Sequence, residues 1–67
     1  MFAVKLARSL LGIGQAQLAS RAGISVRELA RIENGQVTPR EAAARALDGA
    51  LIGIVRDRAR DATMETE

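Results

Sequence analysis

Apolar residues recur every three or four positions along most of this chain, which is the spacing of amphipathic helices. In residues 3–11, AVKLARSLL, charged and hydroxyl side chains separate the apolar ones at that interval. No segment shows the strict alternation of apolar and polar residues that a half-buried strand requires. The pattern therefore predicts an all-α fold.

Residues 15–33, QAQLASRAGISVRELARIE, predict two short helices joined by a tight turn. Gly23 lies where the chain must reverse, since glycine accepts the left-handed backbone conformation that often ends a helix. Ser25 is a good N-cap, and Glu28 three residues later completes an S-x-x-E capping box. The second helix of this pair is therefore expected to begin directly after Ser25.

The second helix of the pair divides into an inward and an outward face. Helical spacing places Leu29 and Ile32 inward and leaves Val26, Arg27 and Arg31 outward. Two arginines on the exposed side of a capped helix suit an anionic partner. On an arbitrary helix, however, they are more often solvated surface.

A loop and a further helix follow. Asn34 and Gly35 indicate the end of the preceding helix, because glycine closes helices in the left-handed conformation. Thr38, Pro39 and Glu41 fit the N-cap, the first position and the third position of a new helix. The sequence thus predicts a helix that begins at Pro39.

The chain after residue 48 allows two interpretations. Gly49 and Gly53 mark either a break before a fifth helix or two glycines tolerated inside one long helix at about 1 kcal/mol each. We favour a break near Gly49. The expected domain covers residues 1–62, and residues 63–67 are expected to form a short, disordered acidic tail.

Composition narrows the functional classes. A chain of 67 residues holds one small domain. It contains neither cysteine nor histidine, so the usual zinc sites and nucleophile–histidine pairs are unavailable, and we expect no enzymatic activity, no cofactor and no metal. No apolar run is long enough to span a membrane. No small-molecule ligand is evident.

Charge is distributed unevenly along the chain. Residues 1–45 contain seven Lys or Arg and three Asp or Glu, whereas residues 46–67 contain three and five. The basic part includes the paired helices, which suits a partner that carries phosphates.

A longer motif links these elements. The pattern R-x6-Q-x2-L-A-x3-G-I-S-x3-L-x2-I-E-N-G-x3-P, over residues 8–39, resembles the Cro/C1-type (XRE-like) helix-turn-helix DNA-binding family of phage repressors, restriction–modification controllers and antitoxins. The resemblance implies a compact, four- to five-helix bundle of the lambda-repressor-like type, in which helices 2 and 3 form the helix-turn-helix. Helix 3 would then lie in the DNA major groove.

The resemblance also implies roles for particular residues. Base contacts are expected from Val26, Arg27 and Arg31. Phosphate contacts are expected from Gln15, Ser25, Asn34, Gly35, Gln36 and Arg40. Arg8 and Glu33 match positions that pair as ions in the family, so we expect them to brace the structure rather than contact DNA.

The implied function is sequence-specific regulation of transcription in the cytoplasm, on double-stranded DNA. The expected protein is a repressor that binds a palindromic operator as a homodimer and blocks polymerase by occupancy. The candidate dimer seam is an apolar cluster that could equally complete the core of a monomer: Leu51, Ile52, Ile54 and Val55. The alternatives are an antitoxin-like module whose C-terminal segment binds a protein, and a nonspecific DNA binder.

Overall fold

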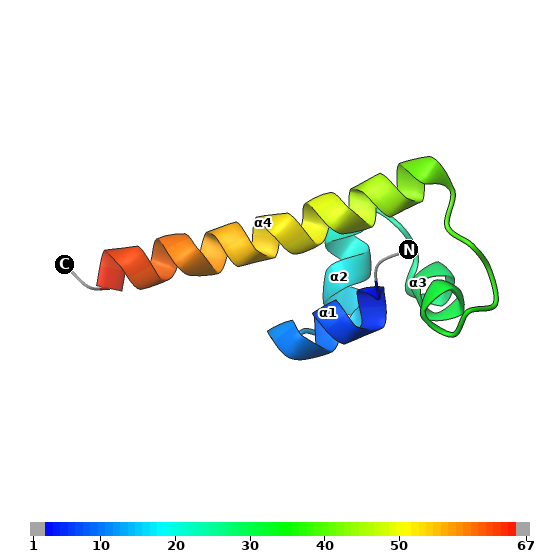
Figure 1. Cartoon of the computed structure of the whole chain (residues 1–67), viewed down its shortest axis with the longest axis horizontal. Coiled ribbons are helices and arrows are strands. Elements are labelled where there is room, and N and C mark those ends of the chain that lie inside the picture. The colour runs from blue at the N-terminus through cyan, green and yellow to red at the C-terminus, as the bar shows by residue number, and fades with distance from the viewer. Residues whose placement is uncertain (1–2, 66–67) are drawn as a thin grey trace.

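The computed structural model describes residues 3–65, with side chains described as far as residue 62, and every secondary-structure element in this part of the chain is an α-helix. Four helices follow one another: α1 (Val4–Leu11), α2 (Gln15–Ala22), α3 (Val26–Glu33) and α4 (Glu41–Glu65). The prediction of an all-α fold is confirmed. Helices α1 and α2 lie against α4, α3 packs against α2, and the C-terminal part of α4 projects beyond the three short helices (Figure 1). The molecule measures 45 × 20 × 20 Å.

The core lies where α2, α3 and α4 meet. Leu18, Leu29 and Leu47 come one from each of these helices, and each is fully buried. Seven further buried apolar residues surround them: Val4, Ile13, Ala19, Ile32, Ala50, Leu51 and Ile54. Since α2 packs against both α3 and α4, the position of α3 is set by the same core that holds α4.

The chain passes from α2 to α3 through Gly23. Gly23 has a φ of 73°, in the left-handed region. Its N–H donates to the carbonyl oxygen of Ser20, and the N–H of Ile24 donates to that of Ala19, so two terminal carbonyls of α2 are satisfied. Ile24 then packs against the core.

The start of α3 has one of the two hydrogen bonds of a capping box. The Oγ of Ser25 accepts a hydrogen bond of 3.0 Å from the backbone N–H of Glu28, as the capping box requires. The reciprocal bond, from the backbone N–H of Ser25 to the Glu28 carboxylate, is absent from the described residues. The cap therefore leaves the Glu28 carboxylate uncommitted.

The predicted start of the last helix is wrong by two residues. Helix α4 begins at Glu41 rather than at Pro39, and the carbonyl oxygen of Arg40 accepts its first helical hydrogen bond, from the N–H of Ala44 at 2.8 Å. Val37 packs against the core and Pro39 is half-buried, which keeps the chain in the loop through Arg40. Packing of the loop outweighs the local Thr-Pro signal.

The predicted break near Gly49 is also wrong, because α4 continues through both glycines. Leu47, Leu51 and Ile54 lie at helical spacing and bury one continuous face of α4. Their packing offsets the weak helix propensity of two glycines. The helical backbone reaches Glu65, and the remaining part of the predicted tail, residues 66–67, lies outside the described residues.

The two glycines differ in their surroundings. A Cβ on Gly53 would lie 2.9 Å from Nη2 of Arg21, whose guanidinium crosses α4 at this point to reach Asp57. A Cβ on Gly49 would meet no atom within 4 Å. The atom that a Cβ on Gly53 would meet is the far end of a flexible arginine side chain, so a side chain there would displace Arg21 rather than the backbone. Within the described part, no helix combines the length and apolar character needed to cross a membrane.

Gly49→Ala is expected to raise the free energy of unfolding by about 1 kcal/mol, since it removes backbone freedom from an exposed helical position without a clash. Gly23→Ala is the contrasting variant, because its positive φ should make it less stable by about 1–2 kcal/mol. Urea unfolding followed by circular dichroism measures both changes. A loss of stability in Gly49→Ala would argue against a continuous α4.

Candidate nucleic-acid interface

Helix α3 presents one face to the core and the other to solvent. Leu29 and Ile32 are buried, whereas Val26, Arg27 and Arg31 are exposed. The residues predicted to contact bases therefore share the accessible side of one short helix. The buried leucine and isoleucine fix the rotation of that helix about its own axis.

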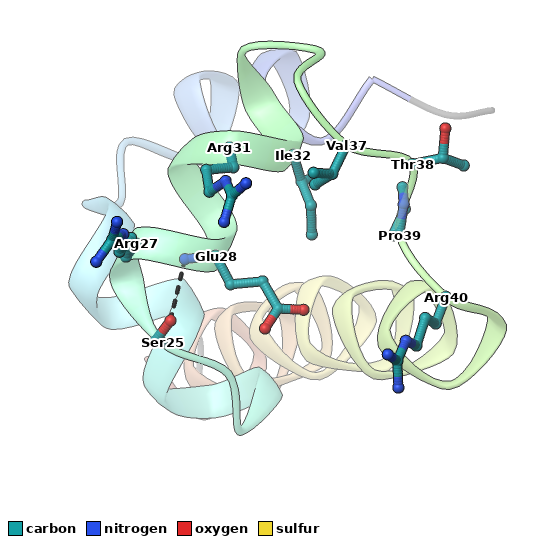
Figure 2. Close-up of a pocket in the computed structure, with 9 residues that line it drawn as sticks. All are labelled: Ser25, Arg27, Glu28, Arg31, Ile32, Val37, Thr38, Pro39 and Arg40. Atoms are coloured by element: carbon teal, nitrogen blue, oxygen red, sulfur yellow. Dashed lines mark hydrogen bonds between the residues drawn. The ribbon is translucent and has the colours of Figure 1, made fainter.

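An open hollow of about 500 Å³ lies between α3 and the loop that leads to α4. Three arginines border it: Arg27 and Arg31 from α3, and Arg40 from the end of the loop (Figure 2). Its other lining residues are Ser25, Glu28, Ile32, Val37, Thr38 and Pro39. Three cationic side chains around one concave surface favour an anionic ligand.

The structure brings four of the predicted contact residues to this hollow, namely Ser25, Arg27, Arg31 and Arg40. Val26 is exposed on α3 but lies outside the lining. The turn after α3 is exposed as well, at residues 34–36, although it does not line the hollow. The predicted contacts thus extend beyond the hollow along the molecular surface.

Arg8 and Glu33 form a two-bonded ion pair between α1 and the end of α3. The Arg8 Nε lies 2.7 Å from Oε2 of Glu33, and Nη2 lies 3.1 Å from Oε1. Arg8 Nη1 also donates to the carbonyl oxygen of Ile13, at 3.0 Å. The side chains are only 15% and 1% exposed, so the pair is an internal brace of the structure.

Gln15 belongs to the same brace, which the sequence did not indicate. Its Nε2 donates a 3.0 Å hydrogen bond to Oε1 of Glu33. The predicted phosphate contact must therefore use the second Nε2 hydrogen of Gln15 or the free backbone N–H groups at the start of α2. Gln15 and Glu33 lie 18 residues apart, and no periodicity links such positions.

The electrostatics of the brace keep Glu33 ionised. Burial alone raises the pKa of the Glu33 carboxyl, but hydrogen bonds from Arg8 and Gln15, with the charges of Arg8 and Lys5, lower it more. The net effect is a pKa below the ordinary value for glutamate. The bond to Glu33 likewise raises the pKa of Arg8, so both members of the pair are charged near neutral pH.

The comparison with known families decides the class of this interface. A family model described as a helix-turn-helix domain matches residues 3–60, which is most of the chain. The chain belongs to the helix-turn-helix domain family. This family indicates DNA as the partner, in agreement with the arginines on α3. Comparisons with curated proteins and with solved structures found no match.

The dimer seam that the sequence predicts for this helix-turn-helix domain is partly buried within the single chain. Leu51 and Ile54 are buried in the core of a single chain, so they cannot also face a partner. Ile52 and Val55 are 45% and 51% exposed. Only these two of the four predicted seam residues remain available for an interface.

Among the described residues, no group of three or more His, Cys, Asp or Glu side chains is placed to hold a metal ion. The exposed polar side chains that line the hollow carry guanidinium, carboxylate and hydroxyl groups. Such groups bind and orient an anion or a base edge.

Proposed function

We propose that this helix-turn-helix domain is a sequence-specific transcriptional regulator of the Cro/C1 type, with α2 and α3 as its helix-turn-helix. The observation that carries the proposal is the exposed face of α3, where Arg27 and Arg31 lie beside an open hollow. The opposite face of the same helix is buried in the core through Leu29 and Ile32. A fixed helix with free polar side chains is the form in which proteins read base edges in the major groove.

Arg27 and Arg31 lie four residues apart and therefore one above the other on α3. Each guanidinium can donate two hydrogen bonds to O6 and N7 of a guanine. Val26 can contact a thymine methyl group. The three side chains together would specify a short half-site.

Contacts with the phosphate backbone of the DNA would hold α3 in register with the base pairs. Gln15 at the start of α2 and Ser25 at the start of α3 lie beside helix N-termini, which favour phosphate. Arg40 adds a cation on the other side of the hollow, and the turn at residues 34–36 offers further polar groups. These groups position the domain on DNA and carry no sequence information themselves.

The proposed regulator acts as a homodimer on a palindromic operator and represses by occupying a promoter. Helix α4 supplies the candidate seam, because Ile52 and Val55 lie three residues apart and expose apolar side chains on one face. One small module buries limited DNA surface, whereas two half-sites one helical turn apart roughly add their binding energies.

Val55→Glu is expected to shift the domain from dimer to monomer, since the seam would then bury two like charges. Sedimentation equilibrium measures the change. Leu10→Glu is the matched control: Leu10 is an exposed apolar residue on α1 and should leave the oligomeric state unchanged. A wild-type protein that is monomeric both in solution and on DNA would exclude the dimer.

A protein-interaction module is the second candidate function. It is favoured by one observation, the exposed, charged end of α4 that projects beyond the other helices (Figure 1). On that account the functional surface would be residues 56–62 rather than α3. DNA binding would then be weak and indifferent to sequence.

Selection of bound duplexes from a random DNA pool tests the proposed function. We expect recovered duplexes to share a motif with inverted half-sites and to bind about 10³-fold or more tightly than scrambled duplexes at physiological salt. Recovery without a shared motif, together with a steep salt dependence, would indicate nonspecific binding instead. Absence of any DNA binding would favour the protein-interaction module.

A further inference from the structure

One side chain in the hollow is not explained by attraction to phosphate. Glu28 extends from the first turn of α3 into the space that Arg31 and Arg40 border (Figure 2). The backbone N–H of Glu28 donates to the Oγ of Ser25, but its carboxylate forms no hydrogen bond or ion pair within the described residues. A free anion thus lies on the surface that should approach a polyanion.

The ordinary explanation is that an acidic residue in the first turn favours a helix through the helix dipole. Glu41, in the first turn of α4, fits that explanation, since it is exposed and pairs with Arg45 on its own helix. Glu28 differs because it leaves Arg31, three residues further on, unpaired. Both charged groups are therefore available to an external partner.

We propose that Glu28 is a specificity-determining residue, whose carboxylate accepts a hydrogen bond from N4 of a cytosine in the major groove. This inference rests on the proposed function and adds a fourth base-reading side chain. A carboxylate only accepts hydrogen bonds, so it suits the amino group of cytosine and is repelled by O6 of guanine and O4 of thymine. Adenine offers an amino group beside the acceptor N7, which makes it a poorer match.

The neighbouring arginine makes the assignment more specific. Glu28 and Arg31 lie on adjacent turns of one face of α3. A C·G pair presents an amino donor on cytosine and two acceptors on guanine in the same groove. Glu28 and Arg31 together therefore carry the acceptor and donors that such a pair requires.

Glu28 should also weaken binding to the wrong sequence. Where no amino group faces it, the exposed carboxylate would lose its water on binding without gaining a hydrogen bond, close to negatively charged phosphates, and this lowers affinity. Discrimination would thus come from a favourable contact with one base and a penalty on the others.

Selection from a random duplex pool with wild type, Glu28→Ala and Glu28→Gln tests the proposal. Wild type is expected to select cytosine at one half-site position. Glu28→Ala should lose that preference and keep the others, with roughly tenfold less discrimination at that position. Glu28→Gln should move the preference toward adenine, because glutamine pairs with N6 and N7 of that base.

Asp61→Asn is the matched control, since it removes one exposed negative charge from the projecting part of α4. It should leave every base preference unchanged. If Glu28→Ala proves too unstable to assay, Glu28→Gln decides, because it retains the size and most of the shape of the side chain.

The failure of this proposal is distinguishable from failure of the proposed function. An unchanged cytosine preference in both Glu28 variants, or no cytosine preference in a wild type that selects a motif, would overturn the role of Glu28 and leave the regulator standing. A wild type that selects no motif would overturn both.

Discussion

Glu33→Ala should lower the free energy of unfolding by about 3–5 kcal/mol, the largest stability effect that we expect in this chain. The substitution would leave the guanidinium of Arg8 mostly buried without its counter-ion. It would also remove the acceptor of the Gln15 bond. A domain of this size has little stability in reserve, so urea unfolding should show a large fall or a partly unfolded population at 25 °C.

Matched variants show whether the loss of stability comes from the buried brace or from the removal of any negative charge. Glu41→Ala breaks an exposed ion pair with Arg45 and should change stability by less than about 1 kcal/mol. Arg8→Met combined with Glu33→Leu should recover part of the loss, because no buried charge then remains. A Glu33→Ala protein as stable as wild type would show that the brace contributes nothing.

The same brace predicts the direction of the pH dependence. Because the pKa of Glu33 is lowered in the folded protein, its contribution is fully present above the pKa of the unfolded chain. It is lost as the pH falls through the lower, folded pKa. Glu33→Gln should therefore flatten the acid limb of the stability curve, measured by thermal unfolding between about pH 2 and pH 6.

Arg31→Ala should weaken binding to the selected operator by about 1–3 kcal/mol per half-site, the largest binding effect that we expect from one side chain. Arg31 borders the hollow and has no ion-pair partner within the described residues, so DNA can use all of its donors. The preference for guanine at one position should relax. Fluorescence anisotropy with the operator and single-base variants measures both changes.

Arg58→Ala is the control for Arg31→Ala. Arg58 is an exposed arginine on the part of α4 that projects beyond the other helices. Its loss removes the same charge from the protein without touching α3. Equal losses of affinity in the two variants, with base preference intact in both, would contradict a reading role for Arg31.

The sequence predicts best those features that nearby residues determine. The left-handed turn at Gly23 and the cap at Ser25 each depend on contacts within about five residues. The start of α4 was mispredicted because Val37 packs against the core and holds the loop beyond Pro39. The break near Gly49 was mispredicted because core packing along α4 outweighs local propensity.

In the candidate site too, nearby residues predict some features, and contacts between distant residues determine the others. The exposure of Arg27 and Arg31 follows from helical spacing in α3. The bond between Gln15 and Glu33 joins residues remote in sequence, and no local rule indicates it. The uncommitted carboxylate of Glu28 is visible only in the structure, since the S-x-x-E pattern predicts that it caps α3.

An NMR titration of the protein with a selected duplex tests the central claim, that α3 is the surface that binds DNA. We expect the largest chemical-shift changes at residues 25–31, with smaller changes at the start of α2 and in residues 34–40. A scrambled duplex should give weaker changes that disappear as salt rises. Changes confined to the projecting end of α4, or no changes with any duplex, would contradict the account.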